Sequence, residues 1–454
     1  MPRCATTALL ALALTAACGR PSAARPPADA GPTDVTSAAD PPTDRPDDAG
    51  GADAADPDPG ARGETSATTV PTPTRRTTPT FATTTPNTTA SATTTTTTTK
   101  KLRKDVWVVG YYATYLFRRY WPEVVRYDAL THLAVTRVVP DDAGGLVAEF
   151  GREGEAGLAL VDDLVRRAHA AGTRTLLMVG GGQAREQLLG ATTDALRPGF
   201  VADLVAFARE HGFDGLDLDW EPLPGTDHDS FLALAADLRS AWPEAVLTAA
   251  VAHLPAGRES ADRMYGRAAE QLDRLNVMTY SMAAAQGGWK SWHSAALYGE
   301  GPDTPASIDH SIRGYLAAGV PAGRLGIGIG FFGVCYTPPV DGPRQELRRA
   351  TIAAADCSMS YAEIMRRYFD PAARRWDAEA RVPYLALAGP TGPHGCSYVS
   401  YEDAQSIAER AAYVAERGLG GAIVWAVNEG YLKHAPEGER DPLMDALAAH
   451  FRAR

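Results

Sequence analysis

Apolar and polar residues follow two different periodicities over residues 105–454. Short apolar runs recur along this part of the chain. Several are apolar almost throughout, as is typical of parallel strands that helices cover on both faces. Amphipathic segments separate most of the runs, and in one of them Leu158, Val161 and Leu164 share a helix face. The runs predict eight β-strands, at Val106–Tyr112, His132–Val138, Thr173–Val179, Gly215–Trp220, Val246–Ala252, Leu275–Ser281, Leu325–Phe331 and Gly420–Ala426.

Eight strands with helices between them predict a (β/α)8 barrel, the α/β fold known as the TIM barrel, with an open doubly wound sheet as the alternative. The interval between the seventh and eighth strands is longer than the others. Residues 334–400 within it predict a small α+β insertion, with a helix at Tyr361–Tyr368 and strands at Ala380–Leu387 and Ser397–Val399. We expect this insertion to form one wall of a groove on the barrel.

The first 18 residues have the pattern of an export signal. A basic residue, Arg3, precedes an apolar run over Ala5–Ala17 that is too short to span a bilayer, which favours a signal peptide. The small residues before Cys18 resemble the bacterial lipobox, in which this cysteine would be lipidated. We therefore expect an exported protein, anchored by lipid to the bacterial envelope or cell surface. Ordinary cleavage that releases a soluble secreted product is the alternative.

Residues 19–104 are rich in Pro, Asp, Ala and Gly and then in Thr, with few large apolar side chains. Such a segment cannot bury enough apolar surface to offset the entropy lost on ordering, so it predicts a disordered linker. The predicted organisation is a signal peptide with lipobox at 1–18, a disordered linker at 19–104 and a barrel domain at 105–454.

Charge and cysteine content narrow the range of partners. The formal net charge of −11 argues against nucleic-acid binding, which would require a basic face.

Beyond the signal and lipobox, three cysteines remain: Cys335, Cys357 and Cys396. In an exported protein we expect one disulfide among them and one thiol left over, and the sequence does not show which two pair. No paired Cys-x-x-Cys spacing suggests zinc. We expect a monomer without metal or cofactor.

The segment Phe213–Glu221 carries the candidate chemistry. Because side chains alternate along a strand, Asp217, Asp219 and Glu221 share one face, opposite the apolar Leu216, Leu218 and Trp220. Clustered buried carboxyls raise one another's pKa, and Glu221 falls at the carboxyl end of the fourth strand, where barrel enzymes place catalysis. The pattern predicts Glu221 as a proton donor. A divalent-metal site or a solvated edge strand are the alternatives.

The pattern Asp-x-x-Asp-x-Asp-x-Glu, filled by Asp214, Asp217, Asp219 and Glu221, resembles the signature of the family 18 glycoside hydrolases, the chitinases and their relatives. Segments 109–112, 276–280, 326–333 and 424–425 are also similar to strands of that family. The resemblance implies substrate-assisted retaining hydrolysis of N-acetylglucosamine polymers. In that mechanism Glu221 protonates the glycosidic oxygen, and the acetamide oxygen of the substrate attacks C1 to give an oxazolinium intermediate.

The resemblance also implies roles for neighbouring residues. Asp219 would orient the acetamide N–H, Asp217 would share its proton, and Tyr280 would donate a hydrogen bond to the acetamide oxygen. Trp425 would lie under the sugar ring. Further candidates for substrate contact are Tyr112, Trp289, Trp292 and Asp214. Ser281 stands where the family often has Asp, which puts substrate preference in doubt.

Three functions remain open at this point. The first is a hydrolase of β-1,4-linked N-acetylglucosamine, acting on chitin or chito-oligosaccharides. The second is an endo-β-N-acetylglucosaminidase acting on glycans or peptidoglycan-like chains. The third is a non-catalytic chitin-binding relative, against which the presence of Glu221 argues. Near these residues, His293 is expected to be structural, and Asn428 and Glu429 either contact substrate or cap a helix.

Overall fold

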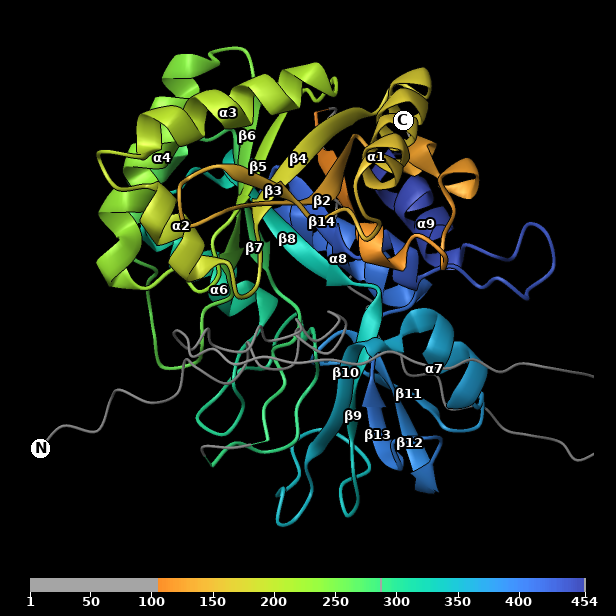
Figure 1. The fold of residues 1–454 in the computed structure, drawn as a ribbon. Helices are drawn as coiled ribbons and strands as arrows, with labels where there is room; N and C mark the ends of the chain where they lie inside the picture. Colours follow the sequence, from red (N-terminus) through yellow and green to blue (C-terminus); the bar gives the residue numbers. More distant parts are fainter. Residues whose placement is uncertain (1–104, 286–287, 453–454) are drawn as a thin grey trace, which may run out of the picture. The chain divides into compact units, whose positions relative to one another are not determined.

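The computed structural model describes residues 105–285 and 288–452 of the 454-residue chain (Figure 1). The predicted signal peptide, Cys18 and the linker lie outside the described residues. Eight parallel strands form the central sheet: β1 (Trp107–Tyr112), β2 (His132–Pro140), β4 (Arg174–Gly180), β5 (Gly215–Asp219), β6 (Val246–Ala252), β7 (Arg274–Met278), β8 (Leu325–Gly330) and β14 (Gly421–Trp425). The sheet closes because β1 pairs in parallel with both β2 and β14. The barrel prediction is confirmed, and the open sheet is excluded.

Helices follow most of the barrel strands. They are α1 (Glu155–Ala170), α2 (Arg185–Ala191), α3 (Arg197–Glu210), α4 (His228–Ala241), α5 (Met264–Gln271), α6 (Ile308–Ala317), α8 (Ala404–Arg417) and α9 (Pro442–Leu447). Short 3₁₀ turns lie at Thr114–Leu116, Pro122–Val124, Tyr127–Ala129, Gly225–Asp227, Ala322–Arg324 and Val427–Glu429, and a π turn at Ala448–Arg452. A short strand, β3 (Leu146–Ala148), pairs antiparallel with β2. None of the helices in the described part of the chain has both the length and the apolar character needed to cross a bilayer.

Alternation along each strand separates two apolar regions. Outward residues such as Leu216, Leu218 and Trp220 pack with the helices in one large cluster. Inward residues such as Trp107, Val109 and Tyr111 form a smaller cluster inside the barrel. The outward face of each barrel strand therefore contributes to stability by packing against helices. The inward face is available for chemistry at the carboxyl end of the strand.

The insertion after β8 is a five-stranded antiparallel sheet with order β10-β9-β13-β12-β11. It lies below the barrel in the view of Figure 1. Its elements are β9 (Phe332–Tyr336), β10 (Ile352–Ser360), α7 (Tyr361–Arg367), β11 (Arg374–Asp377), β12 (Val382–Thr391) and β13 (Cys396–Ser400). The predicted helix and both predicted strands are confirmed within this insertion. A disulfide joins Cys335 on β9 to Cys396 on β13, with a Cα–Cα distance of 5.3 Å, which settles the pair that the sequence left open.

Candidate active site

The three carboxyls of the predicted acidic face rise along β5 toward its carboxyl end. Asp217 and Asp219 are buried, whereas Glu221, just beyond the strand, is partly exposed. Asp217 lies in register with Met178 of β4 and Thr248 of β6. The acidic face therefore points into the barrel, as the alternation of β5 predicts. The site lies at the end of the barrel where strands emerge into their helix-connecting loops.

Asp217, the deepest carboxyl, is held by two hydroxyl donors. Tyr111 on β1 donates to its Oδ2 at 2.6 Å, and Thr248 on β6 donates to its Oδ1. Burial raises the pKa of Asp217, while side-chain hydrogen bonds from Thr248 and Tyr111 oppose the rise. These donors stabilise the anion in a dry environment. Tyr111 and Thr248 are not among the residues predicted from the sequence.

Asp219 and Glu221 form a pair of neighbouring carboxyls whose charges interact. Burial raises the pKa of Asp219 well above its usual value, and the charges of Glu221 and Asp217 raise it further. Burial also raises the pKa of Glu221, against the interaction with Asp219 and the positive charge of Arg137. Because two close carboxyls cannot both ionise cheaply, the pair binds a proton more tightly than isolated carboxyls do. The Oδ1 atom of Asp219 has no hydrogen-bond partner among the described residues and is available to a ligand.

Two aromatic side chains border this pair. Tyr280, two residues beyond β7, the sixth barrel strand, is buried, and burial raises the pKa of its hydroxyl well above the ordinary value. It therefore remains a proton-bearing hydrogen-bond donor. Trp425 ends β14, is partly buried, and its ring centroid lies 5.7 Å from that of Tyr111. Both residues lie with the acidic face in the barrel interior, as their predicted roles require.

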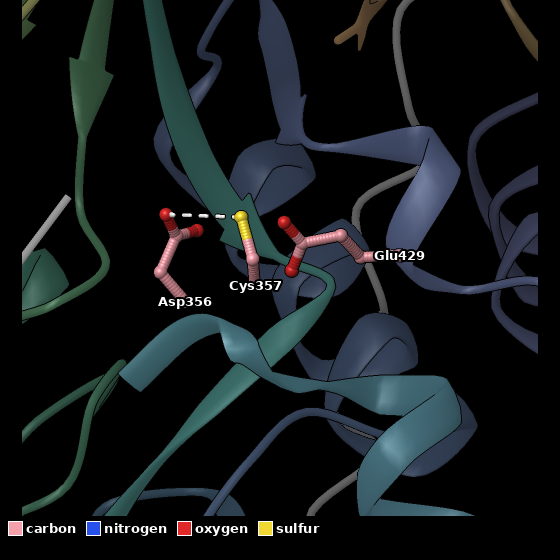
Figure 2. A group of neighbouring side chains, drawn as sticks. All are labelled: Asp356, Cys357 and Glu429. Carbon is pink, nitrogen blue, oxygen red and sulfur yellow. Dashed lines mark hydrogen bonds between the residues drawn. The ribbon is translucent and has the colours of Figure 1, made fainter. Parts of the chain in front are cut away.

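A second acidic group reaches the site from the insertion. Figure 2 shows Asp356 and Cys357 on β10 and Glu429 after β14 with their side chains gathered together, and their candidate ligand atoms all lie within 4.8 Å of one another. The indole Nε1 of Trp425 donates to Asp356 Oδ1 at 3.2 Å. Neither carboxylate oxygen of Glu429 has a hydrogen-bond partner among the described residues.

The charge state of this second group follows from its surroundings. Burial raises the pKa of Asp356 to about 6 and that of Glu429 well above its usual range, while the charge of Arg119 opposes both rises. Arg119 Nη1 donates to the carbonyl of Cys357 at 3.1 Å, so this positive charge lies beside the cluster. A guanidinium and raised carboxyl pKa values favour a shared proton over a bound cation. Asp356 is not among the residues predicted from the sequence.

Two predicted substrate contacts are corrected by the direction of their side chains. Tyr112 points outward from β1, is fully buried, and donates to the Tyr120 carbonyl at 2.6 Å, so it cannot reach a sugar. Asp214 precedes β5 at the opposite end of the barrel. There it accepts from the Thr175 backbone N–H at 2.7 Å, and its Oδ2 lies 2.9 Å from His169 Nε2. Both residues serve the architecture of the barrel.

The two loop tryptophans have different surroundings. Trp292 is fully buried, donates from Nε1 to the Ala306 carbonyl at 2.7 Å, and has the Arg344 guanidinium carbon 4.8 Å from its ring centroid. A ring without exposed surface cannot stack on a ligand, so its predicted sugar contact is corrected to a packing role. Trp289 is partly exposed and lines a cavity of about 420 Å³ together with Glu300 and Arg313. Its predicted contact with substrate stays a prediction.

The remaining candidates are structural. His293 is fully buried, and its two ring nitrogens lie 3.0 Å from Asp377 Oδ2 and 2.9 Å from the Tyr398 hydroxyl. Asn428 accepts from the backbone N–H of Ala113 at 2.8 Å, which ties the loop after β14 to the end of β1.

Comparison with known proteins gives consistent matches. The family model for glycosyl hydrolases family 18 matches residues 107–430. Chitotriosidase-1 of Mus musculus is 30% identical over 280 residues, covering 56% of this chain and 58% of that protein. A probable endochitinase of Caenorhabditis elegans is 30% identical over 287 residues, covering 56% of this chain and 43% of that protein. The chain thus spans about half the length of these two relatives.

The fold is also shared with a solved structure. The crystal structure of the Ostrinia furnacalis Group IV chitinase in complex with allosamidin matches with a TM-score of 0.64 and 23% identity, covering 77% of this chain and 99% of that one. This likeness extends across the barrel and the insertion, and at that identity it concerns the fold. The family match includes every barrel strand, the carboxyls on β5, Tyr280 and Trp425. The chain belongs to the glycosyl hydrolases of family 18.

Proposed function

We propose that the chain hydrolyses β-1,4-linked N-acetylglucosamine polymers, with Glu221 as general acid and base. The observation that carries the proposal is the inward acidic face of β5, which leads to a partly exposed carboxyl, Glu221, whose charge acts on Asp219. A carboxyl that keeps its proton near neutral pH can donate it to a leaving oxygen. Retaining three acidic groups in a dry interior lowers stability, so a role in chemistry accounts for them better than packing does.

The proposed reaction uses the acetamide group of the substrate as nucleophile. Glu221 donates its proton to the glycosidic oxygen as the bond from C1 to that oxygen breaks. The acetamide oxygen forms a bond to C1, giving a cyclic oxazolinium ion. Glu221, now ionised, then removes a proton from water as the water oxygen attacks C1 and reopens the ring. Two inversions at C1 retain the anomeric configuration.

The neighbours of Glu221 suit the proposed intermediate. The unpartnered Oδ1 of Asp219 is an acceptor for the acetamide N–H and a negative charge beside the developing cation. Tyr280 keeps its proton and so can donate to the acetamide oxygen. Asp217 either is ionised or shares a proton with Asp219. The hydrogen bonds that the Tyr111 and Thr248 hydroxyls donate to it determine the balance between these two states. Trp425 presents a partly exposed ring for stacking against a sugar face.

The names of the relatives support the substrate class. Two curated relatives are a chitotriosidase and a probable endochitinase, and a protein of the same fold was solved with allosamidin. We therefore propose chitin or chito-oligosaccharides as substrate. An endo-β-N-acetylglucosaminidase would use the same carboxyls, and products from graded substrates distinguish the two activities.

The test compares wild type, Glu221→Gln and Asp237→Asn on N-acetylglucosamine oligomers of graded length. Asp237 is a matched control because it lies half-exposed on α4, where it bonds Arg197. We expect Glu221→Gln to lose at least about a thousandfold in kcat while still binding oligomers, and Asp237→Asn to match wild type. Allosamidin should inhibit wild type competitively, and EDTA should leave its activity unchanged. Glu221→Gln hydrolysing at the wild-type rate would refute the assignment.

We also propose that the protein is exported and held at the cell envelope by a lipid on Cys18. Support for this location comes from the sequence pattern of residues 1–18 alone. A neutral extracellular polysaccharide is compatible with an acidic protein presented on a long polar tether.

A further inference from the structure

One cation lies beside the catalytic carboxyls without being part of the acidic face. Arg137 is near the carboxyl end of β2 and is partly exposed. The pairing of β2 with β4 shifts register between Val135 and Val138, so Arg137 lies within an irregular stretch of the strand. Such irregularities break the simple alternation of a strand and redirect the side chains within them.

The Arg137 guanidinium is clamped from two sides. On one side Nη1 donates to the carbonyls of Gly180 and Gly182, at 3.2 and 3.1 Å, in the loop that follows β4. On the other side Nε and Nη2 approach Glu149 Oε2 at 2.8 and 2.7 Å. The backbone N–H of Glu149 in turn donates to the Arg137 carbonyl at 2.9 Å. A planar guanidinium held by these contacts has little freedom to move.

This clamp lies next to the peptide that carries Asp219. Gly180 is the register partner of Asp219, and the Gly181 N–H donates to the Asp219 carbonyl at 2.5 Å. A Cβ on Gly181 would lie 3.0 Å from Arg137 Nη1, and its φ of +100° also favours glycine. The glycines therefore let the guanidinium approach β5 without an intervening side chain.

We propose that Arg137 is a positioning residue for the proposed reaction: its clamped guanidinium fixes the loop after β4 against β5 and keeps a constant positive charge beside the Asp219–Glu221 pair. This inference rests on the proposed function. It predicts that the charge limits how tightly the pair holds its protons, so that the pair still carries one negative charge at neutral pH.

The electrostatic setting agrees with this role. Burial is the largest cause of the raised pKa of both Asp219 and Glu221, and the charge of Arg137 lowers both values. The other titratable groups around the pair either raise the pKa of Asp219 or have their own pKa raised by the charge of Asp219 or Glu221. They are Asp217 on β5, Tyr111 on β1, Tyr280 after β7 and Asp356 on β10. Glu149, on the far side of Arg137, is the remaining neighbour of opposite charge.

The simpler reading is that Arg137 and Glu149 form an ordinary surface ion pair. Such pairs contribute little to stability and would leave the protonation of Asp219 and Glu221 unchanged. The pH dependence of catalysis therefore distinguishes the two interpretations. Only a charge that acts on Asp219 and Glu221 shifts the pH profile.

The experiment measures kcat and KM against pH for wild type, Arg137→Met, Arg137→Lys and Glu149→Gln on a fluorogenic di-N-acetylchitobiose glycoside. Arg137→Met should move both limbs of the profile to higher pH by about one unit, since a nearby unit charge is removed. Arg137→Lys keeps the charge but not the bidentate fork, so its profile should stay in place while kcat falls. Glu149→Gln should move the profile slightly to lower pH.

A second readout does not depend on activity. The free energy of unfolding should fall more steeply between about pH 5 and pH 8 in Arg137→Met than in wild type, because Asp219 and Glu221 then bind protons more tightly in the folded state. If Arg137→Met shifts neither the profile nor this slope, the inference is overturned. Should Arg137→Met not fold, the Arg137→Lys variant provides the test. A shift of its pH profile from that of wild type would then overturn the inference. An inactive wild type whose Arg137→Met slope still steepens would refute the proposed function and leave the electrostatic role of Arg137 supported.

Discussion

Asp356 allows a direct test of how much stability a buried charge in the site costs. The residue is nearly fully buried, and its carboxyl accepts from the Trp425 indole. Its backbone φ of +51° lies in the left-handed region, which Asn tolerates as well as Asp. Asp356→Asn therefore removes the charge while keeping the side-chain shape, the acceptor for Trp425 and the backbone conformation.

The size of the effect follows from the pKa. Burial raises the pKa of Asp356 from 3.8 to about 6, so the folded protein binds this proton more tightly than the unfolded chain does. Its free energy of unfolding therefore falls as pH rises from about 4 to about 6, by up to about 3 kcal/mol once the carboxyl is ionised. Asp356→Asn avoids this loss. We expect the variant to exceed wild type by about 2–3 kcal/mol at pH 8 and by less than about 1 kcal/mol at pH 4.

The assay is urea denaturation at the two pH values, with Asp377→Asn as a control of opposite sign. Burial alone would raise the pKa of Asp377, but hydrogen bonds from His293 and Arg344 outweigh it and hold the pKa well below its usual range. That carboxylate contributes stability above its unfolded pKa, so Asp377→Asn should be less stable than wild type at pH 8. Asp356→Asn being no more stable than wild type at pH 8 would refute the reasoning, because the buried charge would then have no cost.

Three further predictions concern other parts of the molecule. The pair Cys335→Ala and Cys396→Ala opens a loop with a sequence separation of 61 and should lower the free energy of unfolding by about 4 kcal/mol, as guanidinium denaturation would show; a loss below about 1 kcal/mol contradicts it. Trp292→Ala should lower the free energy of unfolding by about 3–5 kcal/mol because the ring is fully buried. Trp289→Ala should weaken oligomer binding, measured by calorimetry, at nearly unchanged Tm. The reverse outcome would exchange the roles of the two residues. Cys18→Ala should move the protein from the membrane fraction to the soluble fraction of an expressing bacterium, and a variant that still sediments with membranes argues against the lipid anchor.

The barrel and the acidic face could be predicted because both depend on local periodicity. Apolar runs indicate where the parallel strands lie, and the alternation along β5 places Asp217, Asp219 and Glu221 together whatever surrounds them. The same reasoning could not choose between Tyr111 and Tyr112. Two adjacent tyrosines occupy opposite faces of β1, and only the register of β1 with its neighbours shows that Tyr111 is the inward one.

Asp214 and Trp292 show two other limits of sequence reasoning. Asp214 belongs to the same acidic motif as Glu221, yet seven residues of strand span roughly 20 Å, so the motif runs from one end of the barrel to the other. Trp292 follows a loop at the rim, but it packs against Ala380 and Val382 of the insertion. Sequence proximity to the site does not reveal that a distant segment covers the ring.

Two charged residues near the carboxyls of β5 lie on irregular backbone. Arg137 lies in the register shift of β2, and Asp356 lies in a shift of β10 with a left-handed φ. The rule that side chains alternate fails at such places, so neither residue could be assigned a direction from the sequence. Against the effect of burial, the charge of Arg137 lowers the pKa of Asp219 and Glu221. For Asp356, burial and then the charge of Glu221 raise the pKa. The barrel strand thus supplies the carboxyls of the proposed reaction, while the irregular segments of β2 and the insertion place charged groups near them. If Arg137 acts as proposed, relatives that keep the same acidic face but replace this arginine should differ in working pH.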